Sequence, residues 1–155
     1  MVRLWNRIVE EGNAFPQEEP LTKESGKLFF AGQSYCGVAA DENGKVCGLS
    51  ILHPNNIGRC GHIANASYAV DASYRGRHLG ELLVRDSMAA AIRLGFSILQ
   101  FNAVVESNRP ARRLYERLGF RQLGVIPNGF RMKDGSYANI CPYYISLVSA
   151  PEGQS

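Results

Sequence analysis

A polar turn between two apolar segments carries residue types that suit phosphate binding. Residues 70–80 read VDASYRGRHLG. A strand-like apolar run, residues 63–70, enters this turn, and a long amphipathic pattern, residues 79–94, leaves it. Backbone N–H groups at the start of a helix have no partner within the helix, and the positive end of the helix dipole lies behind them. The turn therefore predicts an anion site in which the N–H groups of residues 75–79 face one point.

Glycines at two positions in this turn, Gly76 and Gly80, allow a ligand and a neighbouring strand to approach the backbone closely. The turn contains neither the G-x-G-x-x-G fingerprint of dinucleotide-binding domains nor the G-K-[ST] ending of a P-loop. An ordinary polar turn between a strand and a helix has a similar composition. The residues of this turn alone therefore do not distinguish one kind of anion site from another.

A second block, residues 101–120, makes that distinction and reads FNAVVESNRPARRLYERLGF. The two blocks together resemble the GNAT superfamily of acyl-CoA N-acyltransferases. The family's pyrophosphate loop reads Q/R-x-x-G-x-G/A after a V-x-x-x-x-R-G approach, and its next helix reads N-x-x-A-x-x-L-Y-x-x-x-G-F. The resemblance covers roughly residues 46–147 and rests on Val70, Arg75, Gly76, Leu79 and Gly80 in the first block and Asn108, Ala111, Leu114, Tyr115, Gly119 and Phe120 in the second.

The resemblance implies a three-layer α/β/α domain with a mixed sheet that is splayed at its centre. One GNAT N-acetyltransferase domain would span residues 1–148, with a flexible tail at 149–155. The family has a strand before its first helix, and this sequence begins too late to supply a full one, so we expect that strand to be missing or truncated. The pattern of strands, helix, strand, helix and strands agrees with an α/β class.

The resemblance also implies acetyl-CoA as cosubstrate and no metal. The main chain of the strand that ends at Val70 would bind the pantetheine arm, and a backbone N–H near Val70 would stabilise the oxyanion. Asn108 would bond the pantetheine arm, cap its helix, or do both. The family usually has glycine where this chain has His78, which bears on how closely the pyrophosphate approaches. The expected cofactor-binding residues are Tyr68, Ala69, Val70, Arg75, Gly76, Arg77, His78, Leu79, Gly80, Asn108, Ala111 and Tyr115.

Acyl transfer to an amine needs an acid for the departing thiolate and a base for the amine. Tyr115, at the family's tyrosine position, is the expected acid, since reference pKa values of a phenol and a thiol lie within roughly two units. Packing of the ring alone is the alternative. Glu106 is the expected base because it follows the end of a strand, and His53, His62 and a water chain remain alternatives.

The acceptor is expected to be a small-molecule amine or an amino acid, and Phe130 and Tyr137 would line its pocket unless they only pack within their loop. A protein N-terminus or lysine is the alternative acceptor, and a coenzyme-A-binding module without turnover is the alternative outside enzymes. A homodimer is left open. Arginines near the two helix starts would meet the 3′-phosphate of coenzyme A or form a solvated basic face; they are Arg75, Arg77, Arg109, Arg112 and Arg113.

Composition excludes several other classes. The chain has 155 residues, 45% of them hydrophobic, which suits one domain with one core, and its formal net charge of +3 gives no reason to expect a nucleic-acid partner. No apolar run reaches the roughly 18 residues of a membrane span and no signal peptide is visible, so we expect a cytoplasmic protein without a membrane partner. The four cysteines form no C-x-x-C pair, and we expect them to stay reduced.

Hydrophobic periodicity and turn residues predict the elements that must position these groups. Helices are expected at residues 2–12, 22–30, 79–94 and from Asn108 to Gly119, and strands at 35–40, 46–52, 63–70, 98–105, 122–126 and 140–148. The apolar stripe of the 79–94 helix is wide, which predicts little solvent face. Phe130, Arg131 and Tyr137 are expected in a polar loop between the last two strands.

Overall fold

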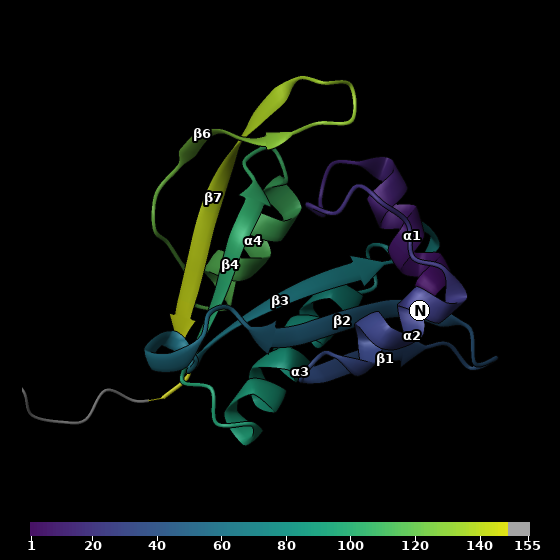
Figure 1. The fold of residues 1–155 in the computed structure, drawn as a ribbon, viewed down its shortest axis with the longest axis horizontal. Coiled ribbons are helices and arrows are strands. Elements are labelled where there is room, and N and C mark those ends of the chain that lie inside the picture. Colours follow the sequence, from purple (N-terminus) through teal and green to yellow (C-terminus); the bar gives the residue numbers. More distant parts are fainter. Residues whose placement is uncertain (149–155) are drawn as a thin grey trace, which may run out of the picture.

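Helices cover both faces of one mixed sheet in the computed structural model, which describes residues 1–148 (Figure 1). The strands are β1 (Tyr35–Ala40), β2 (Val46–Pro54), β3 (Ile63–Val70), β4 (Ile98–Val105), β5 (Arg121–Gln122), β6 (Ile126–Arg131) and β7 (Tyr137–Ser146). The α-helices are α1 (Val2–Glu11), α2 (Lys23–Ala31), α3 (Leu79–Arg93) and α4 (Arg109–Arg117). The strand order is β1-β2-β3-β4-β7-β5, with β6 paired to β7. The predicted three-layer architecture is confirmed.

The N-terminal helices pack on one face of the sheet. The stripe predicted for residues 2–12 is buried in α1, and Gly12 ends the helix in the left-handed conformation, with φ of 67°. Trp5 is 1% exposed and contacts the rings of Phe15 and Phe29, with centroids 4.3 and 4.9 Å away. A capping box between Thr22 and Ser25 starts α2. This aromatic cluster holds α1 and α2 to the face formed by β2 and β3.

On the opposite face, α3 and α4 share a second core with the centre of the sheet. The predicted start of α3 is correct and its end lies one residue earlier, at Arg93, but the expectation of little solvent face is wrong. Leu82 is 59% exposed, and Ile92 and Leu94 are about half exposed, whereas the polar Ser87 is fully buried. The helix meets the sheet along one narrow face, so the apolar stripe is wider than the contact that it makes.

The central parallel pair of strands is short. β3 pairs with β4 only from Ile63↔Ile98 to Asn65↔Gln100, although each strand has eight residues. Beyond that point the two strands diverge, as Figure 1 shows for β4 and β7 leaving β3. On their outer sides, β3 stays paired with β2 along its whole length, and β4 stays paired with β7. The sheet is therefore continuous at one end of β3 and β4 and open at the other.

The C-terminal strands differ from the prediction. Of the strand expected at 122–126 only the two ends pair: Gln122 pairs together with Arg121 as β5, and Ile126 begins β6. Phe130 and Arg131 belong to β6 and Tyr137 begins β7, so the expected loop is a hairpin with a short turn. Pro127 and Gly129 read as loop residues, yet the register shift between Ile126 and Phe130 accommodates them as a bulge. The predicted tail at 149–155 lies outside the described residues.

Trp5 is predicted to be the principal anchor of α1. Because its side chain is fully buried among aromatic rings, Trp5→Ala should lower the free energy of unfolding by about 3–5 kcal/mol. Leu28→Ala is the matched control. Because Leu28 is 77% exposed on α2, this substitution should change the free energy of unfolding by less than about 0.5 kcal/mol. Urea denaturation measures both values, and equal values for the two variants would contradict the assignment.

Candidate functional site

The divergence of β3 from β4 leaves main-chain groups of β3 without a neighbouring strand. The Asp71 N–H donates to the Cys47 carbonyl and the Asn55 N–H donates to the Ile63 carbonyl, each at 2.8 Å, so odd-numbered residues point their main chain toward β2. Residues 66, 68 and 70 therefore point their N–H and C=O groups toward the opening. Such unpaired groups are costly unless a ligand or water bonds them.

Two of the three β3 residues expected to bind the cofactor have this orientation. The main chains of Tyr68 and Val70 face the opening. Ala69 does not: its carbonyl lies on the β2 side near Gly48, and its side chain is buried under α1. The main chain of Ala69 is therefore not free to bond a cofactor in the opening, because successive residues of a strand point their main-chain groups in opposite directions.

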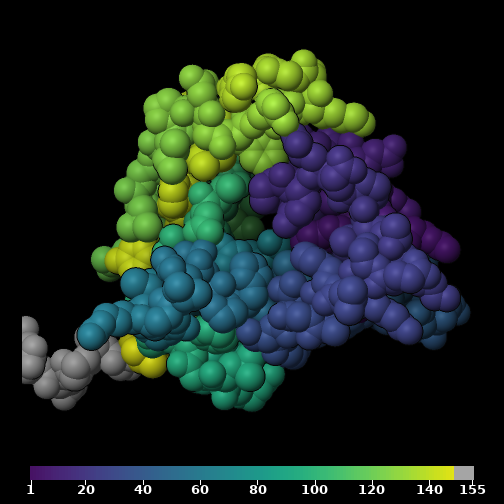
Figure 2. Space-filling view, in the orientation of Figure 1, coloured from purple at the N-terminus to yellow at the C-terminus, as the bar shows by residue number. Residues whose placement is uncertain are grey.

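A cavity of about 560 Å³ lies in the opening. Its walls come from β3, β4, the end of β2, the loop before α2 and the end of α2. Asn108 and Tyr115 of the second block reach it as well. Figure 2 shows a hollow in this face, between the purple N-terminal residues and the teal and green strands. We call this cavity the cleft.

Tyr115 is brought into the cleft by α4, as expected for a residue that contacts the reacting atoms. Its ring packs against Phe101 and Tyr143, with centroids 4.5 and 5.9 Å away. Burial raises the pKa of Tyr115 well above its ordinary value, and Tyr143 raises it further. The close match of phenol and thiol pKa values assumed from the sequence therefore does not hold. The phenol stays protonated and is suited to donating a hydrogen bond to a developing thiolate.

Asn108 begins α4 and also lines the cleft. Its Oδ1 accepts from the Ala111 N–H at 3.4 Å, which is long for a hydrogen bond, and its own N–H donates to Val105. The helix cap predicted from the sequence is present. The side-chain nitrogen of Asn108, Nδ2, remains available to donate to a ligand. Ala111 thus contributes its N–H to the cap.

The expected phosphate loop has two residues in the left-handed backbone conformation. Gly76 and His78 have φ of 79° and 59°, and α3 begins directly after them. The amides of Leu79, Gly80 and Glu81 lie in the first turn of α3 and so have no partner within the helix. A side chain added at Gly76 would meet no atom within 4 Å, which leaves space for a ligand above the loop. The positive φ at His78 explains why glycine suits that position in the family.

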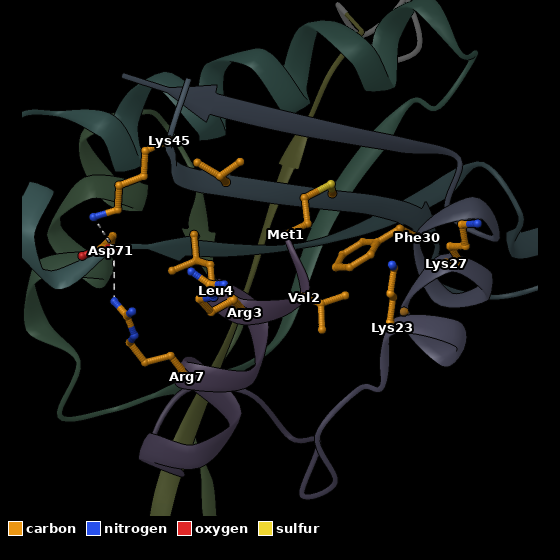
Figure 3. Close-up of a pocket in the computed structure, with 12 residues that line it drawn as sticks. Met1, Val2, Arg3, Leu4, Arg7, Lys23, Lys27, Phe30, Lys45 and Asp71 are labelled. Atoms are coloured by element: carbon orange, nitrogen blue, oxygen red, sulfur yellow. Dashed lines mark hydrogen bonds and ion pairs between the residues drawn. The ribbon is translucent and has the colours of Figure 1, made fainter. Parts of the chain in front are cut away.

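Asp71 fastens the loop to the end of β3. Its Oδ1 accepts from the Ser73 N–H at 2.9 Å, and its Oδ2 pairs with Arg7 at 3.1 Å and with Lys45 at 3.7 Å (Figure 3). The hydrogen bond from Ser73 lowers the pKa of Asp71, and the two cations act in the same direction against the effect of burial. Asp71 therefore remains ionised and holds the turn that precedes the phosphate loop.

Glu106 is placed differently from the expectation. Its carboxylate accepts from the Asn139 side chain at 2.9 Å, its N–H donates to the Asn139 carbonyl, and it does not line the cleft. The short turn after β4 directs this side chain toward β7, on the far side from β3. The expected base is therefore turned away from the cavity where the amine would react.

His53 lines the cleft and His62 does not. His53 Nδ1 lies 2.9 Å from the Pro54 carbonyl, which can only accept, so the neutral ring carries its proton on Nδ1. The lone pair is then on Nε2. The cross-strand partner of His53 is Asn65, the last β3 residue that pairs with β4. The imidazole of His53 therefore lies at the point where β3 and β4 begin to diverge.

Phe130 and Tyr137 line a different cavity, of about 1080 Å³, between the β6–β7 hairpin and the loop before α2. This second cavity shares Phe15, Pro16 and Gln17 with the cleft. Phe130 is buried against Val105 and Ile140, so it also packs within the core. The two aromatic residues line the adjoining cavity and do not line the cleft itself.

The arginines near the helix starts divide into two groups. Arg112 is drawn inward, where it donates to the Tyr143 hydroxyl at 3.1 Å and to the Glu106 carbonyl at 3.0 Å. Its hydrogen bond with Tyr143 raises the pKa of Arg112. Arg112 is therefore a structural residue, whereas Arg75 and Arg77 lie on the exposed loop itself.

A third cavity, of about 940 Å³, lies between α1, α2 and β2 and is lined by cationic side chains (Figure 3). Asp71 is the one residue of the two sequence blocks that lines it, and Tyr115 does not line it. Within residues 1–148, no cluster of side chains is placed to hold a metal ion. No helix in that same range is long and apolar enough to cross a membrane.

Polar side chains of the cleft were not predicted from the sequence. They include Gln33, Asn55, Asn65 and Asn102. The sequence carries a signal for two of them, because Asn65 and Asn102 are polar residues within mainly apolar strands. Asn102 lies in the register shift of β4 between Phe101 and Val104, and such bulges redirect side chains beside active sites.

Comparisons with known proteins agree with this geometry. The model of the acetyltransferase (GNAT) family matches residues 3–120. The N-acetyltransferase aca1 of Schizosaccharomyces pombe is 29% identical over 146 residues, covering 83% of this chain and 69% of its own. A GCN5-related N-acetyltransferase from Kribbella flavida is 33% identical, with a TM-score of 0.84 over 94% of this chain and 89% of that chain.

A phosphinothricin acetyltransferase from Sinorhizobium meliloti, solved in complex with acetyl-CoA, has the same fold. Its TM-score is 0.87 at 20% identity, over 99% of this chain and 84% of that chain. The splayed sheet, the loop at the start of α3 and the family match together identify acetyl-CoA as the cosubstrate. The chain belongs to the GNAT family of acetyltransferases and is an N-acetyltransferase.

Proposed function

We propose that this enzyme transfers an acetyl group from acetyl-CoA to the primary amine of a small molecule. The observation that carries the proposal is the modest size of the cleft and the segments that wall it. Residues 14–17 and the end of α2, at Gly32 and Gln33, form walls opposite the free edges of β3 and β4. A cavity of about 560 Å³ suits a small acceptor beside the end of the pantetheine arm. A phosphinothricin acetyltransferase of the same fold also acts on a small molecule.

The proposed cofactor contacts follow from the loop and the strand edge. Amides of residues 76–80 would bind the pyrophosphate at the start of α3. The outward-facing main chain of Tyr68 and Val70 would bond the pantetheine amides, and the Val70 N–H would stabilise the oxyanion. The Asn108 side-chain amide would bond the arm from the other side of the opening. Holding both reactants in this way can supply roughly 7–11 kcal/mol toward the barrier.

Two residues that line the cleft are assigned to the amine proton and to the leaving thiolate. His53 would accept the proton of the attacking amine on Nε2, since Nδ1 is committed to Pro54. Tyr115 would donate a hydrogen bond to the departing thiolate. His53 replaces Glu106 in this scheme because Glu106 is held by Asn139 outside the cleft. The amine attacks the thioester carbonyl directly, and the C–S bond breaks as the tetrahedral intermediate collapses.

A protein N-terminus or a lysine is the second candidate acceptor. The cavity beside the cleft favours it, because about 1080 Å³ bordered by the β6–β7 hairpin has room for residues that follow an acceptor group. Thiol release from acetyl-CoA, measured across a panel of small primary amines and short peptides, tests the proposal. Faster turnover of the small amines is expected, and turnover confined to peptides would contradict it.

His78 is predicted to serve the phosphate loop through its backbone. His78→Gly should leave coenzyme A affinity unchanged or improved, because glycine adopts a φ of 59° without strain. His78→Val should weaken it about tenfold or more, since a β-branched residue opposes that conformation. Titration calorimetry with coenzyme A gives both affinities. A tenfold loss in the glycine variant would instead assign a phosphate contact to the imidazole.

Tyr115→Phe removes one hydroxyl and keeps the packing against Phe101. The maximal rate kcat should fall by roughly 10²–10⁴, the range for a positioned acid, while coenzyme A affinity and the acceptor KM change little. Steady-state kinetics with the best amine of the panel measures these values. An unchanged kcat would remove the hydroxyl from the mechanism and leave water as the proton source.

His53→Ala is predicted to abolish most turnover, and added imidazole should restore part of it by occupying the vacated space. His62→Ala, which alters an exposed residue outside the cleft, is the matched control and should keep its full rate. Initial rates with and without imidazole decide between chemistry and packing. If the His53 variant keeps the wild-type rate, the amine loses its proton to water.

A further inference from the structure

The wall of the cleft carries no fixed charge. Among the cleft residues that the structure describes, none is Asp, Glu, Lys or Arg. Six carboxamide side chains supply most of its polar atoms: Gln17, Gln33, Asn55, Asn65, Asn102 and Asn108. Aromatic rings, including Phe15 and Phe101, form much of the remaining surface. The cleft is therefore polar without being charged.

Several of these carboxamides are held in place by hydrogen bonds. Gln100 Nε2 donates to Asn102 Oδ1 at 2.9 Å, and Asn102 Nδ2 donates to Asn55 Oδ1 at 2.6 Å. The chain of bonds crosses from β4 to the end of β2, over the start of β3. Because Asn55 Oδ1 is held by this chain, the side-chain nitrogen Nδ2 of Asn55 is a donor whose position is already fixed. Ordered donors of this kind select a ligand by its hydrogen-bonding groups.

Gln33 supplies a complementary acceptor. Its Nε2 donates to the Phe29 carbonyl at 3.0 Å, which fixes the side chain at the end of α2. Its Oε1 is buried and has no hydrogen-bond partner within residues 1–148. A buried carbonyl without a partner is unfavourable and gains most from an N–H group of a ligand. The cleft therefore offers both a donor and an acceptor to an uncharged polar group.

The charged residues of the adjoining cavity do not supply a counter-ion. Arg131 is paired with Glu18, and Lys133, whose Nζ donates to the Glu10 carbonyl at 2.9 Å, lines the adjoining cavity and not the cleft. A ligand carboxylate placed beside the buried Gln33 Oε1 would lose hydration there and face another acceptor, without gaining a cation from the cleft wall. Burial of an unpaired charge is strongly unfavourable, whereas a carboxamide can bond both Asn55 and Gln33.

We propose, on the basis of the proposed function, that the acceptor is an amine whose other polar groups are uncharged, of the α-amino amide class. Free amino acids, which carry a carboxylate beside the amine, are poor acceptors. The substrate is thus distinguished by the absence of charge next to the reacting nitrogen. The reaction is the same acetyl transfer, with the amine nitrogen forming the new C–N bond as the C–S bond of acetyl-CoA breaks.

L-leucinamide and L-leucine test this inference, because they differ only in the carboxamide and the carboxylate. Thiol release gives kcat/KM for each, calculated on the concentration of neutral amine so that their different amine pKa values do not enter. The ratio should favour L-leucinamide about a hundredfold or more. Equal values, or a preference for L-leucine, would overturn the inference and leave the small-molecule acetyltransferase in place.

A variant pair tests whether the missing cation is the cause. Gln17→Arg places a cation on the cleft wall and should raise kcat/KM for L-leucine relative to L-leucinamide by about tenfold. Gln17→Met, a neutral residue of similar length, should leave the ratio unchanged. A ratio that shifts equally in both variants would show that shape, and not charge, sets the preference, and would overturn the inference.

A leucyl peptide with an amidated C-terminus separates this inference from the proposed function. It presents the same uncharged group beside its amine but is larger. A peptide kcat/KM more than tenfold above that of L-leucinamide would contradict the small-molecule proposal while supporting an uncharged acceptor. Absence of turnover with all three acceptors and with the whole amine panel would overturn both.

Discussion

The early end of the pairing between β3 and β4 is the constraint on which the site depends. Three residue pairs, from Ile63↔Ile98 to Asn65↔Gln100, fix the two strands side by side, and beyond them the backbone of β3 has one free edge. Buried backbone groups need partners, and an extended molecule with amides of its own can supply them. The same divergence opens the cleft and places Tyr115 at its inner end. Cofactor binding and the reaction site thus share one structural origin.

The phosphate loop depends on backbone conformation more than on side chains. Two residues with positive φ, Gly76 and His78, lie directly before the first turn of α3. Asp71 fixes the start of this turn through Ser73, Arg7 and Lys45. The amides are therefore positioned before a phosphate arrives, so little conformational freedom is lost on binding. A histidine at a left-handed position is compatible with this arrangement because its role requires only its main chain.

The cleft contrasts with its surroundings in charge. The other two cavities contain lysine and arginine side chains together with carboxylates, whereas carboxamides, aromatic rings and His53 line the cleft. An uncharged wall keeps the amine less hydrated and favours its neutral, reactive form. Burial also keeps Tyr115 protonated, since it raises the pKa of that phenol. The charge environment of the cleft thus agrees with its geometry: both suit a neutral attacking amine and a protonated Tyr115 that donates to the thiolate.

The sequence by itself determined the family, the central strand β3 and its helix α3, and the positions of Tyr115 and Asn108, because these depend on local periodicity and on motifs with fixed spacing. Only the tertiary structure decided which side chains meet. Glu106 follows β4 as predicted, but its turn directs the carboxylate to Asn139, and Ala69 points its main chain to β2 by strand alternation. His53 and Gln33 are distant in sequence from both motifs and reach the cleft through strand pairing and the end of α2. Local patterns carry no information on such long-range contacts, which arise only when the sheet forms.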